Sequence, residues 1–440
     1  MFLDTALRDR EAKGTPVRVA IVGAGATGRA IALQLGTPAP GIRLVAIANR
    51  TVAHAERALR EAGISDWSRV DSARDADAAI ARGVPALTDD PSVLTACDGV
   101  DLIVEVTGSV GAGARVVLQA CNQGKDVVLV NAELDSLLGP ILKAKADQAG
   151  VVLTHTDGDE PGVAMTLLRY LRTCGLRAVA AGNIKGMVDY YRNPETQRAF
   201  AEKNDQDARK VTSFADATKL SMETTVLANA TGFRVGRRGM HGPACKDVSE
   251  MARLLPADQM LETGLVDYAL GAAPHTGAFV VVHEDSPLKQ VQLGYYKLGA
   301  GPFYVFYTPY HLPHIQIAST IGRAAVHRDA TVAPLAGPVC EVVTVAKRDL
   351  KAGERLDGIG GFCAYGLIDN AAPSRAASAL PIGLSEGCVL RRDVLKDQVV
   401  SFDDVVVSGQ DPLVLNLWDE QLARWPGATS NQPAPAGSTV

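Results

Sequence analysis

Short apolar runs alternate with helical patterns along the first third of the chain. The apolar runs, each bounded by turn residues as strands buried in parallel sheets are, lie at 17–22, 44–48, 101–106 and 126–130. The helical patterns lie at 29–35, 52–62 and 113–123. This alternation predicts an α/β domain with a doubly wound parallel sheet over residues 1–155.

The pattern changes beyond about Thr154. Pro161 suits the first turn of a helix that ends before Gly175. Strand-like runs at 278–282 and 304–307 then mix with helices and Gly/Pro loops. We therefore expect an α+β domain over 156–314.

The last third divides further. Residues 315–330 look helical and could return to the first domain. Short strands and glycine-rich turns predict a small all-β domain over 338–408. Residues 425–440, rich in Pro, Ala, Ser and Gly, are expected to be disordered.

Composition narrows the function classes. The 440 residues are 47% apolar, which excludes a wholly disordered chain. A net charge of −5 excludes a nucleic-acid protein that relies on overall positive charge. No apolar run approaches the roughly 20 residues of a membrane-spanning helix. Seven scattered cysteines without a C-x-x-C pair suit reduced thiols, so we expect a cytoplasmic protein. Separately, we expect a small-molecule substrate and a homo-oligomer, either a dimer or a tetramer.

A glycine motif follows the first predicted strand. Gly23, Gly25 and Gly28 fit G-x-G-x-x-G between a strand and a helix, and Ala26 and Thr27 complete the turn. Glycine there permits a tight turn, close approach of a pyrophosphate, and contact between helix and strand. The motif predicts a Rossmann-type dinucleotide site, although a simple strand-to-helix turn would look the same.

The end of the second strand bears on the choice of cofactor. An NAD enzyme usually has an acidic residue there, whereas this chain has Asn49 and Arg50. An arginine can pair with a 2′-phosphate, so the sequence predicts NADP(H); the alternative is that Arg50 is a solvated surface charge. Polar residues that follow later strands complete the expected cofactor site: Thr107, Gly108, Asn131 and Glu133.

Six motifs carry a family resemblance over about residues 3–408. They are VGAG at 22–25, N-x-E-x-D at 131–135 followed by Gly139-Pro140, GDEP at 158–161, NATG at 229–232, GMHGP at 239–243 and PYHL at 309–312. With them the chain resembles the deoxyxylulose 5-phosphate reductoisomerase-like enzymes, which are related to homoserine dehydrogenase. Residues 338–407, with AKRDL-x-x-GE at 346–354 and LPIGL at 380–384, resemble a SAF domain.

The resemblance implies that the domain over 156–314 serves catalysis and dimerisation, with a catalytic segment in the middle of the chain. Residues 216–220 resemble the aspartate-to-lysine segment of homoserine dehydrogenases, which implies that Lys219 donates a proton. Glu223, four residues on, would share its helix face as a partner or substrate ligand, or the two would form an ordinary surface ion pair. Homoserine dehydrogenases usually carry a lysine after the asparagine that corresponds to Asn131. This chain has Ala132-Glu133 there, so homoserine itself is a doubtful substrate.

Further polar residues complete the predicted site, each with a structural alternative. Lys185 could bind a substrate phosphate or carboxylate, and His241 could reach a ligand from its tight loop. The expected substrate-binding residues are Asp159, Glu160, Asn229, Tyr310 and His311. Whether a divalent cation is needed stays open, because Asp159, Glu160 and Glu223 could supply oxygen ligands. Lys347 could lean toward an anionic substrate or lie on a solvated face.

These observations predict an NADP-dependent oxidoreductase that reduces a small hydroxylated carbonyl compound. One form is a reductoisomerase acting on 1-deoxy-D-xylulose 5-phosphate in isoprenoid biosynthesis. The alternatives are a homoserine-dehydrogenase-type enzyme acting on another alcohol, polyol or sugar acid, and a nucleotide-binding protein without turnover.

Overall fold

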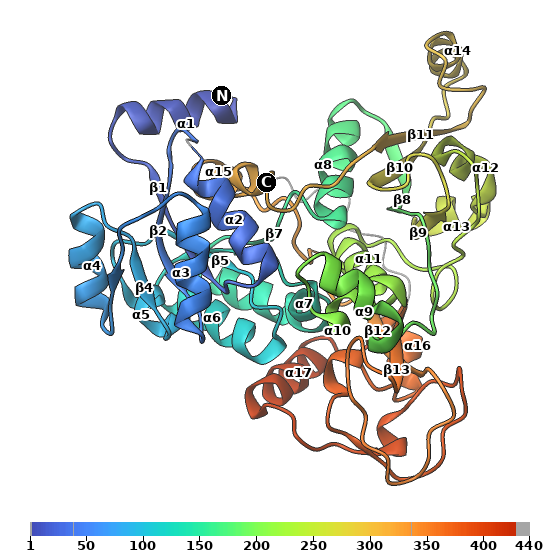
Figure 1. Ribbon diagram of the computed structural model, residues 1–440. Coiled ribbons are helices and arrows are strands. Elements are labelled where there is room, and N and C mark those ends of the chain that lie inside the picture. The colour runs from blue at the N-terminus through green and yellow to red at the C-terminus, as the bar shows by residue number, and fades with distance from the viewer. Residues whose placement is uncertain (1, 38, 336, 428–440) are drawn as a thin grey trace. The chain divides into compact units, whose positions relative to one another are not determined.

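The computed structural model describes residues 2–37, 39–335 and 337–427, and the chain forms two compact units (Figure 1). The first unit comprises residues 1–159 with 312–333, and the second comprises 160–311 with the described residues from 334 on. The disorder expected over 425–440 falls, from residue 428, outside the described residues. Within the described chain, no helix has the length and apolar character needed to cross a membrane.

The first unit is built on a seven-stranded sheet in which all neighbouring strands run parallel. In spatial order the strands are β3 (Ser68–Arg69), β4 (Ala86–Thr88), β2 (Ile42–Ala48), β1 (Val17–Val22), β5 (Leu102–Glu105), β6 (Asp126–Leu129) and β7 (Leu153–His155). The strand order reverses beside β1, and in such sheets this switch point places a ligand at the carboxyl ends of the strands. The predicted Rossmann-type α/β fold is confirmed.

Helices connect these strands: α2 (Ala26–Gly36), α3 (Val52–Glu61), α4 (Ala73–Ala81), α5 (Pro91–Ala96), α6 (Val110–Asn122) and α7 (Ala132–Ala149). The unit also contains α1 (Leu3–Ala12), which precedes β1, and α15 (Ile317–His327), which comes from far along the chain. Side chains of Ser72, Asp90 and Ser109 cap the starts of α4, α5 and α6 by accepting backbone N–H bonds. These caps explain why helices begin at those points.

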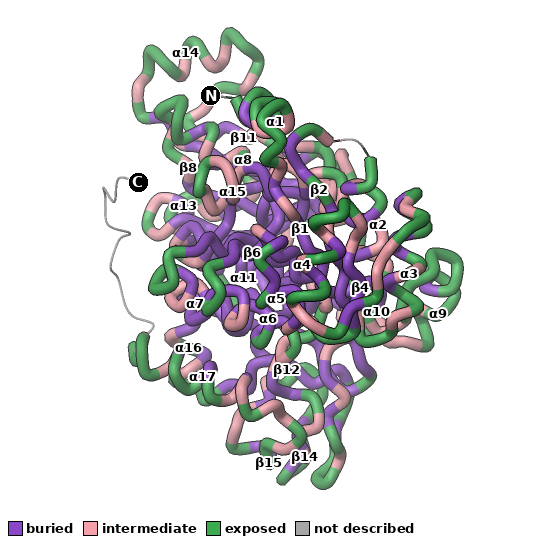
Figure 2. Tube along the Cα trace, turned by 90° about the vertical axis from the view of Figure 1, so that its left-hand side faces the viewer, coloured by how far each residue is buried: buried purple, intermediate pink, exposed green. Residues whose placement is uncertain are grey.

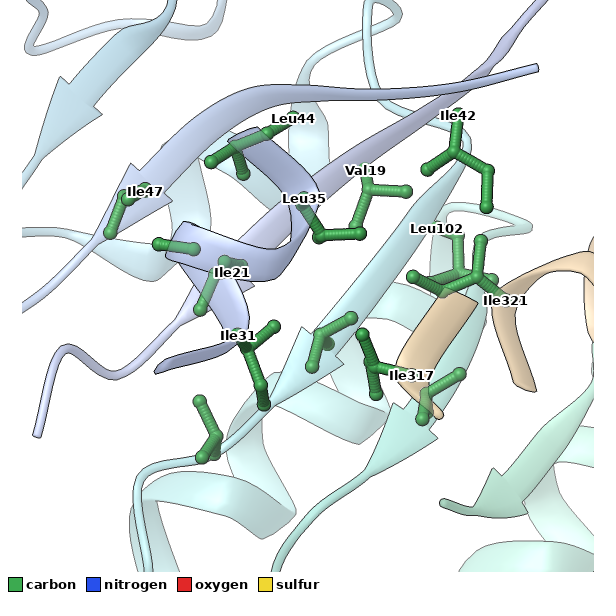
Figure 3. Close-up of a cluster of buried hydrophobic side chains, with 14 of the residues drawn as sticks. Val19, Ile21, Ile31, Leu35, Ile42, Leu44, Ile47, Leu102, Ile317 and Ile321 are labelled. Atoms are coloured by element: carbon green, nitrogen blue, oxygen red, sulfur yellow. The ribbon is translucent and has the colours of Figure 1, made fainter. Parts of the chain in front are cut away.

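A core of aliphatic side chains joins the sheet to its covering helices (Figure 3). Val19, Ile21 and Leu102 on the strands are fully buried. Ile317 and Ile321 of α15 pack into the same cluster, although more than two hundred residues separate them from these strands along the chain. The helical segment from Leu312 therefore lies in the first unit.

The second unit contains a four-stranded sheet. Its order is β11 (Phe303–Thr308), β10 (Ala278–His283), β8 (Arg177–Lys185) and β9 (Leu265–Leu270). Strand β8 runs parallel to β9 and antiparallel to β10, so this sheet is mixed. The accompanying helices are α8 (Glu160–Thr173), α9 (Pro194–Lys203), α10 (Ala208–Ala215), α11 (Thr218–Thr231), α12 (Met251–Leu254), α13 (Ala257–Glu262) and α14 (Pro287–Tyr295), with a 3-10 turn η1 (Val248–Glu250).

A small β-rich part, here called the C-terminal module (residues 340–406), completes the second unit. Its two antiparallel pairs are β12 (Cys340–Ala346) with β13 (Ala364–Asn370), and β14 (Val389–Leu390) with β15 (Val405–Val406). Short helical segments are α16 (Ala371–Ala376), η2 (Ile382–Leu384) and η3 (Phe402–Asp404), and α17 (Pro412–Arg424) follows. Strands β12 and β13 pack on α11, of which all residues but Lys219 are buried (Figure 2).

Candidate active site

The glycine-rich turn after β1 has the conformation that the sequence motif predicts. Gly23 adopts φ +112°, and a Cβ there would lie 2.7 Å from the carbonyl oxygen of Val106. A Cβ on Gly28 would lie 2.2 Å from the carbonyl oxygen of Gly23. These two glycines are therefore needed for packing within the protein.

Gly25 differs from its two neighbours in the motif. It has no positive φ, it is exposed, and a Cβ there would meet no atom of the described chain within 4 Å. Gly25 is also the N-cap of α2, and no side chain of the described residues caps this helix. An open glycine beside an uncapped helix N-terminus fits the approach of a phosphate group.

The Asn49–Thr51 segment lies against this turn. The side-chain oxygen of Asn49 accepts a 2.9 Å hydrogen bond from the backbone N–H of Ala24, and its amide donates to the carbonyl oxygen of Thr51. Arg50, between these two anchors, is exposed. Asn49 thus holds the glycine-rich turn, while the guanidinium of Arg50 stays accessible to a ligand.

A buried polar network follows β5. The carboxylate of Glu105 accepts bonds from the backbone and hydroxyl of Thr107 and, at 2.9 Å, from the side-chain amide of Asn131. Asn131 also caps α7 by accepting from Leu134. Burial raises the pKa of Glu105, and these donors oppose the rise. Thr107 and Asn131 therefore form hydrogen bonds within the protein's own framework. Of the other two residues predicted with them, Gly108 is exposed and Glu133 is buried.

A histidine that the sequence analysis did not single out lies between two carboxylates in the first unit. The Nδ1 atom of His155, at the end of β7, lies 3.0 Å from Oδ2 of Asp135. Its Nε2 atom lies 3.0 Å from Oδ2 of Asp159. Burial opposes the charge on His155, but the two carboxylates outweigh it and raise the pKa to about 9. The structure thus gives Asp159, predicted to bind substrate, a partner inside the protein.

The second unit brings several predicted residues together around one ammonium group. Lys185, at the end of β8, donates to Glu160, the first residue of α8, and its Nζ lies 3.5 Å from Oε2 of Glu223 on α11. The side chains of Glu160 and Glu223 are 3% and 4% exposed, so both carboxylates are buried. The ammonium of Lys185 thus bridges Glu160 and Glu223, which are two of the three carboxylates considered above as metal ligands.

Two further side chains adjoin this lysine–carboxylate cluster. Asn183 on β8 donates to Glu223 over 3.1 Å, while its own side-chain oxygen is buried and has no hydrogen-bond partner among the described residues. His311 places Nε2 3.6 Å from Glu160, and its Nδ1 pairs with the hydroxyl of Thr276 at 2.9 Å. The cluster therefore offers a buried acceptor on Asn183 beside a charged donor on Lys185.

Lys219 lies on the same helix as Glu223. It follows the first residue of α11 and is half-buried, and Glu223 comes one turn later. The stretch is helical, as the shared face of the two residues requires. The carboxylate of Glu223 accepts hydrogen bonds from Asn183 and Lys185. This segment is not a simple surface ion pair, because Glu223 is buried.

The predicted loop histidine is bound elsewhere. The imidazole Nε2 of His241 lies 3.0 Å from the side-chain oxygen of Gln259. The buried carboxylate of Asp267 accepts the backbone N–H groups of His241 and Gly242, which fixes the loop. Burial raises the pKa of Asp267, and these bonds oppose the rise. The structure therefore gives the imidazole of His241 a partner within the protein, on α13.

Two other expected substrate ligands also lie apart from the cluster's bonds. The side-chain oxygen of Asn229 accepts from the backbone N–H groups of Val339 and Cys340, at 2.8 and 3.0 Å. Asn229 therefore anchors the start of the C-terminal module. Tyr310 is 48% exposed, next to His311, which does reach Glu160.

Sequence reasoning missed Asn183, His155 and Glu105 as polar members of these networks. Each lies near the carboxyl end of a strand that otherwise reads as apolar, a position where open sheets hold ligands. A polar residue at the end of a predicted strand was the available signal in the sequence. The solvated face expected for Lys347 is wrong, because its side chain is buried against Asp216.

Comparison with known families places these features in a class. Residues 158–317 match a model described as the catalytic domain of oxidoreductase DRL, and residues 23–155 match the NAD-binding domain of homoserine dehydrogenase. Residues 341–406 match the SAF domain. The chain is therefore an oxidoreductase with a Rossmann-type domain for NAD or NADP and a SAF domain. The narrower resemblance to deoxyxylulose 5-phosphate reductoisomerase stays a prediction.

Solved structures give more distant likenesses. A probable dehydrogenase from Thermotoga maritima is 16% identical with a TM-score of 0.36, over 60% of this chain and 72% of its own. 1-Deoxy-D-xylulose 5-phosphate reductoisomerase from Zymomonas mobilis is 18% identical with a TM-score of 0.33, over 48% of this chain and 56% of its own. Scyllo-inositol dehydrogenase from Lactobacillus casei is 12% identical with a TM-score of 0.41, over 72% of this chain and 89% of its own. At such values the likenesses assign no activity to this chain. No curated protein matches the sequence significantly.

Proposed function

We propose that the protein is an NADP(H)-dependent oxidoreductase that reduces a small hydroxylated carbonyl compound. The cluster of Lys185 with the buried carboxylates of Glu160 and Glu223 carries this proposal. It lies in the segment matched by an oxidoreductase catalytic domain. The first unit would bind the dinucleotide and the second unit the substrate.

The side chains of the cluster suit a polyhydroxylated substrate. Two carboxylates fix the ammonium of Lys185, and the side chain of this lysine is 22% exposed. The ammonium can therefore donate to a substrate oxygen or phosphate. The free oxygen of Asn183 can accept from a substrate hydroxyl, which would satisfy a buried acceptor. Lys219 would give the proton to the oxygen that becomes an alkoxide, and Glu223 would position the substrate.

The cofactor site suits a dinucleotide. Its pyrophosphate would lie over Gly25 at the N-terminus of α2, and Arg50 would pair with a 2′-phosphate. The bound cofactor supplies the hydride. Because a carbonyl with an adjacent hydroxyl can also rearrange before reduction, a reductoisomerase acting on 1-deoxy-D-xylulose 5-phosphate is the specific form we propose.

A substrate panel with Glu223→Gln tests the active site. NADPH oxidation is followed by absorbance with 1-deoxy-D-xylulose 5-phosphate, other hydroxycarbonyls and sugar acids. The variant should lose about 100-fold in kcat, because Glu223 orders both Asn183 and Lys185. Glu195→Gln, on the exposed surface of the same unit, is the matched control and should keep full activity.

The panel also separates the candidate reactions. Turnover of a polyol or sugar acid without rearrangement would replace the reductoisomerase by a simple dehydrogenase. Full activity of Glu223→Gln would refute the assigned site. Absence of turnover with every compound, in a protein that binds NADPH, would favour a nucleotide-binding protein.

Arg50→Ala tests the choice of cofactor. Loss of a charged hydrogen bond to the 2′-phosphate should raise the KM for NADPH by about 10- to 100-fold and leave the KM for NADH unchanged. Arg82→Ala, an exposed arginine of the same unit, should alter neither. An unchanged KM for NADPH in Arg50→Ala would contradict the NADP assignment.

A further inference from the structure

The C-terminal module is bonded to the helix that carries Lys219 and Glu223. Lys347, just after β12, is 4% exposed in its side chain and lies 2.9 Å from Oδ2 of Asp216, which is fully buried. The ammonium also donates to the carbonyl oxygens of Arg192 and Gly361, at 2.7 and 2.8 Å. All three of its hydrogens therefore have acceptors, which a buried ammonium needs.

Asp216 links Lys347 to the start of α11 through a second hydrogen bond. Its Oδ1 accepts a 3.0 Å bond from the backbone N–H of Thr218, the first residue of the helix. Ala217, between them, adopts φ +69°, a left-handed conformation that a non-glycine residue keeps only where its surroundings enforce it. Burial raises the pKa of Asp216, and the ammonium of Lys347 opposes that rise.

The module contacts α11 at two further points. The backbone N–H of Gly366 on β13 donates to the hydroxyl of Thr218 over 2.8 Å. At the other end of the helix, Asn229 accepts the backbone N–H groups of Val339 and Cys340. Both ends of the helix are thus bonded to strands β12 and β13 or to their immediate flanks.

We propose that Lys347 is a positioning residue, through which the C-terminal module fixes the first turn of α11 and so the place of Lys219 and Glu223. The inference rests on the function proposed above for those two residues. Residues 216–220 resemble the aspartate-to-lysine segment of homoserine dehydrogenases. We assign Asp216 a structural role within that segment, because its carboxylate faces Lys347. The module is thereby part of the catalytic apparatus although it supplies no group to the reaction.

The double variant Lys347→Met/Asp216→Asn tests this role. It removes both buried charges together, so no unpaired charge is left, and the asparagine oxygen can still accept from Thr218. We expect kcat to fall by about 10- to 100-fold, because displacement of about 1 Å has that effect on a positioned group. The KM for NADPH should stay within about twofold, and amide hydrogens of residues 218–223 should exchange faster than in wild type.

Lys351→Met is the matched control. It breaks an exposed ion pair with Asp393 on the same module and should leave kcat and amide exchange unchanged. The proposal is overturned if the double variant keeps wild-type kcat, or wild-type exchange over 218–223. It is also overturned if the variant loses NADPH binding and its folded structure together with activity. If wild type turns over no substrate, the proposed function fails, while the exchange comparison still decides whether Lys347 holds α11.

Discussion

At the scale of single residues, His155 shows how burial and partners decide the charge of a side chain. Burial alone would keep this imidazole neutral, yet both ring nitrogens face a carboxylate oxygen at 3.0 Å. A charged imidazole can donate from both nitrogens, whereas a neutral one leaves one nitrogen without a proton. The two carboxylates therefore hold the proton on His155, and the proton in turn holds the two carboxylates together.

This arrangement predicts a pH-dependent stability. The pKa of His155 is raised from its ordinary 6.5 to about 9, so the folded protein binds this proton more tightly than the unfolded chain does. The resulting stabilisation, about 3 kcal/mol, is fully present below pH 6.5 and is lost as pH rises through 9. In His155→Gln, the free energy of unfolding should be lower at pH 6.5 and fall less steeply toward pH 9.5. Urea titrations at several pH values measure both quantities.

His54→Gln serves as the control for this measurement. His54 is exposed on α3, so its replacement should leave the pH dependence of wild type intact. An equally steep decline in His155→Gln and wild type would show that another group carries the dependence.

Which site residues were predictable depended on the kind of signal each one gave. Lys185 ends a strand and Glu160 begins a helix, so their charge and position marked them. Glu223 was marked by its four-residue spacing from Lys219. Asp216 and Lys347 are 131 residues apart, and only the folded chain reveals that they pair. His241 and Asn229 lay in conspicuous motifs, but their hydrogen bonds hold loops and strands of the protein itself.

At the scale of elements, clear apolar runs located β1, β2, β5 and β6. The two-residue β3 and three-residue β4 went unpredicted, because so few residues show no periodicity. The long helix α7 was missed for a different reason. Its residues 132–142 are all buried, so the apolar face that marks a surface helix is absent from the sequence. Helix α11, which is buried nearly all round, was not predicted as an element. The spacing of Lys219 and Glu223 indicated only that they would share a face if the stretch were helical.

At the scale of the whole chain, the first unit is completed by a segment from far along the sequence. Ile321 on α15 is fully buried in the core of this unit, and α15 also contacts α1 at the start of the chain. The backbone N–H of His155, at the end of β7, also donates a 2.9 Å hydrogen bond to the carbonyl oxygen of Val332 in this segment. The nucleotide-binding unit therefore cannot be complete before residues beyond the second unit's sheet have been made.

Ile321→Ala tests how much this returning segment contributes. The substitution leaves a cavity in the core, which should lower the free energy of unfolding of the first unit by about 2–5 kcal/mol. NADPH would bind the first unit when it is folded and not when it is unfolded. Saturating NADPH should therefore restore much of the lost thermal stability without changing the side-chain packing. Denaturant titration measures the effect. The control His327→Ala, at the exposed end of the same helix, should change the midpoint denaturant concentration of unfolding little. If Ile321→Ala unfolds at the wild-type denaturant concentration, α15 adds nothing to the stability of the nucleotide-binding unit, and the sheet with its local helices must be stable without it.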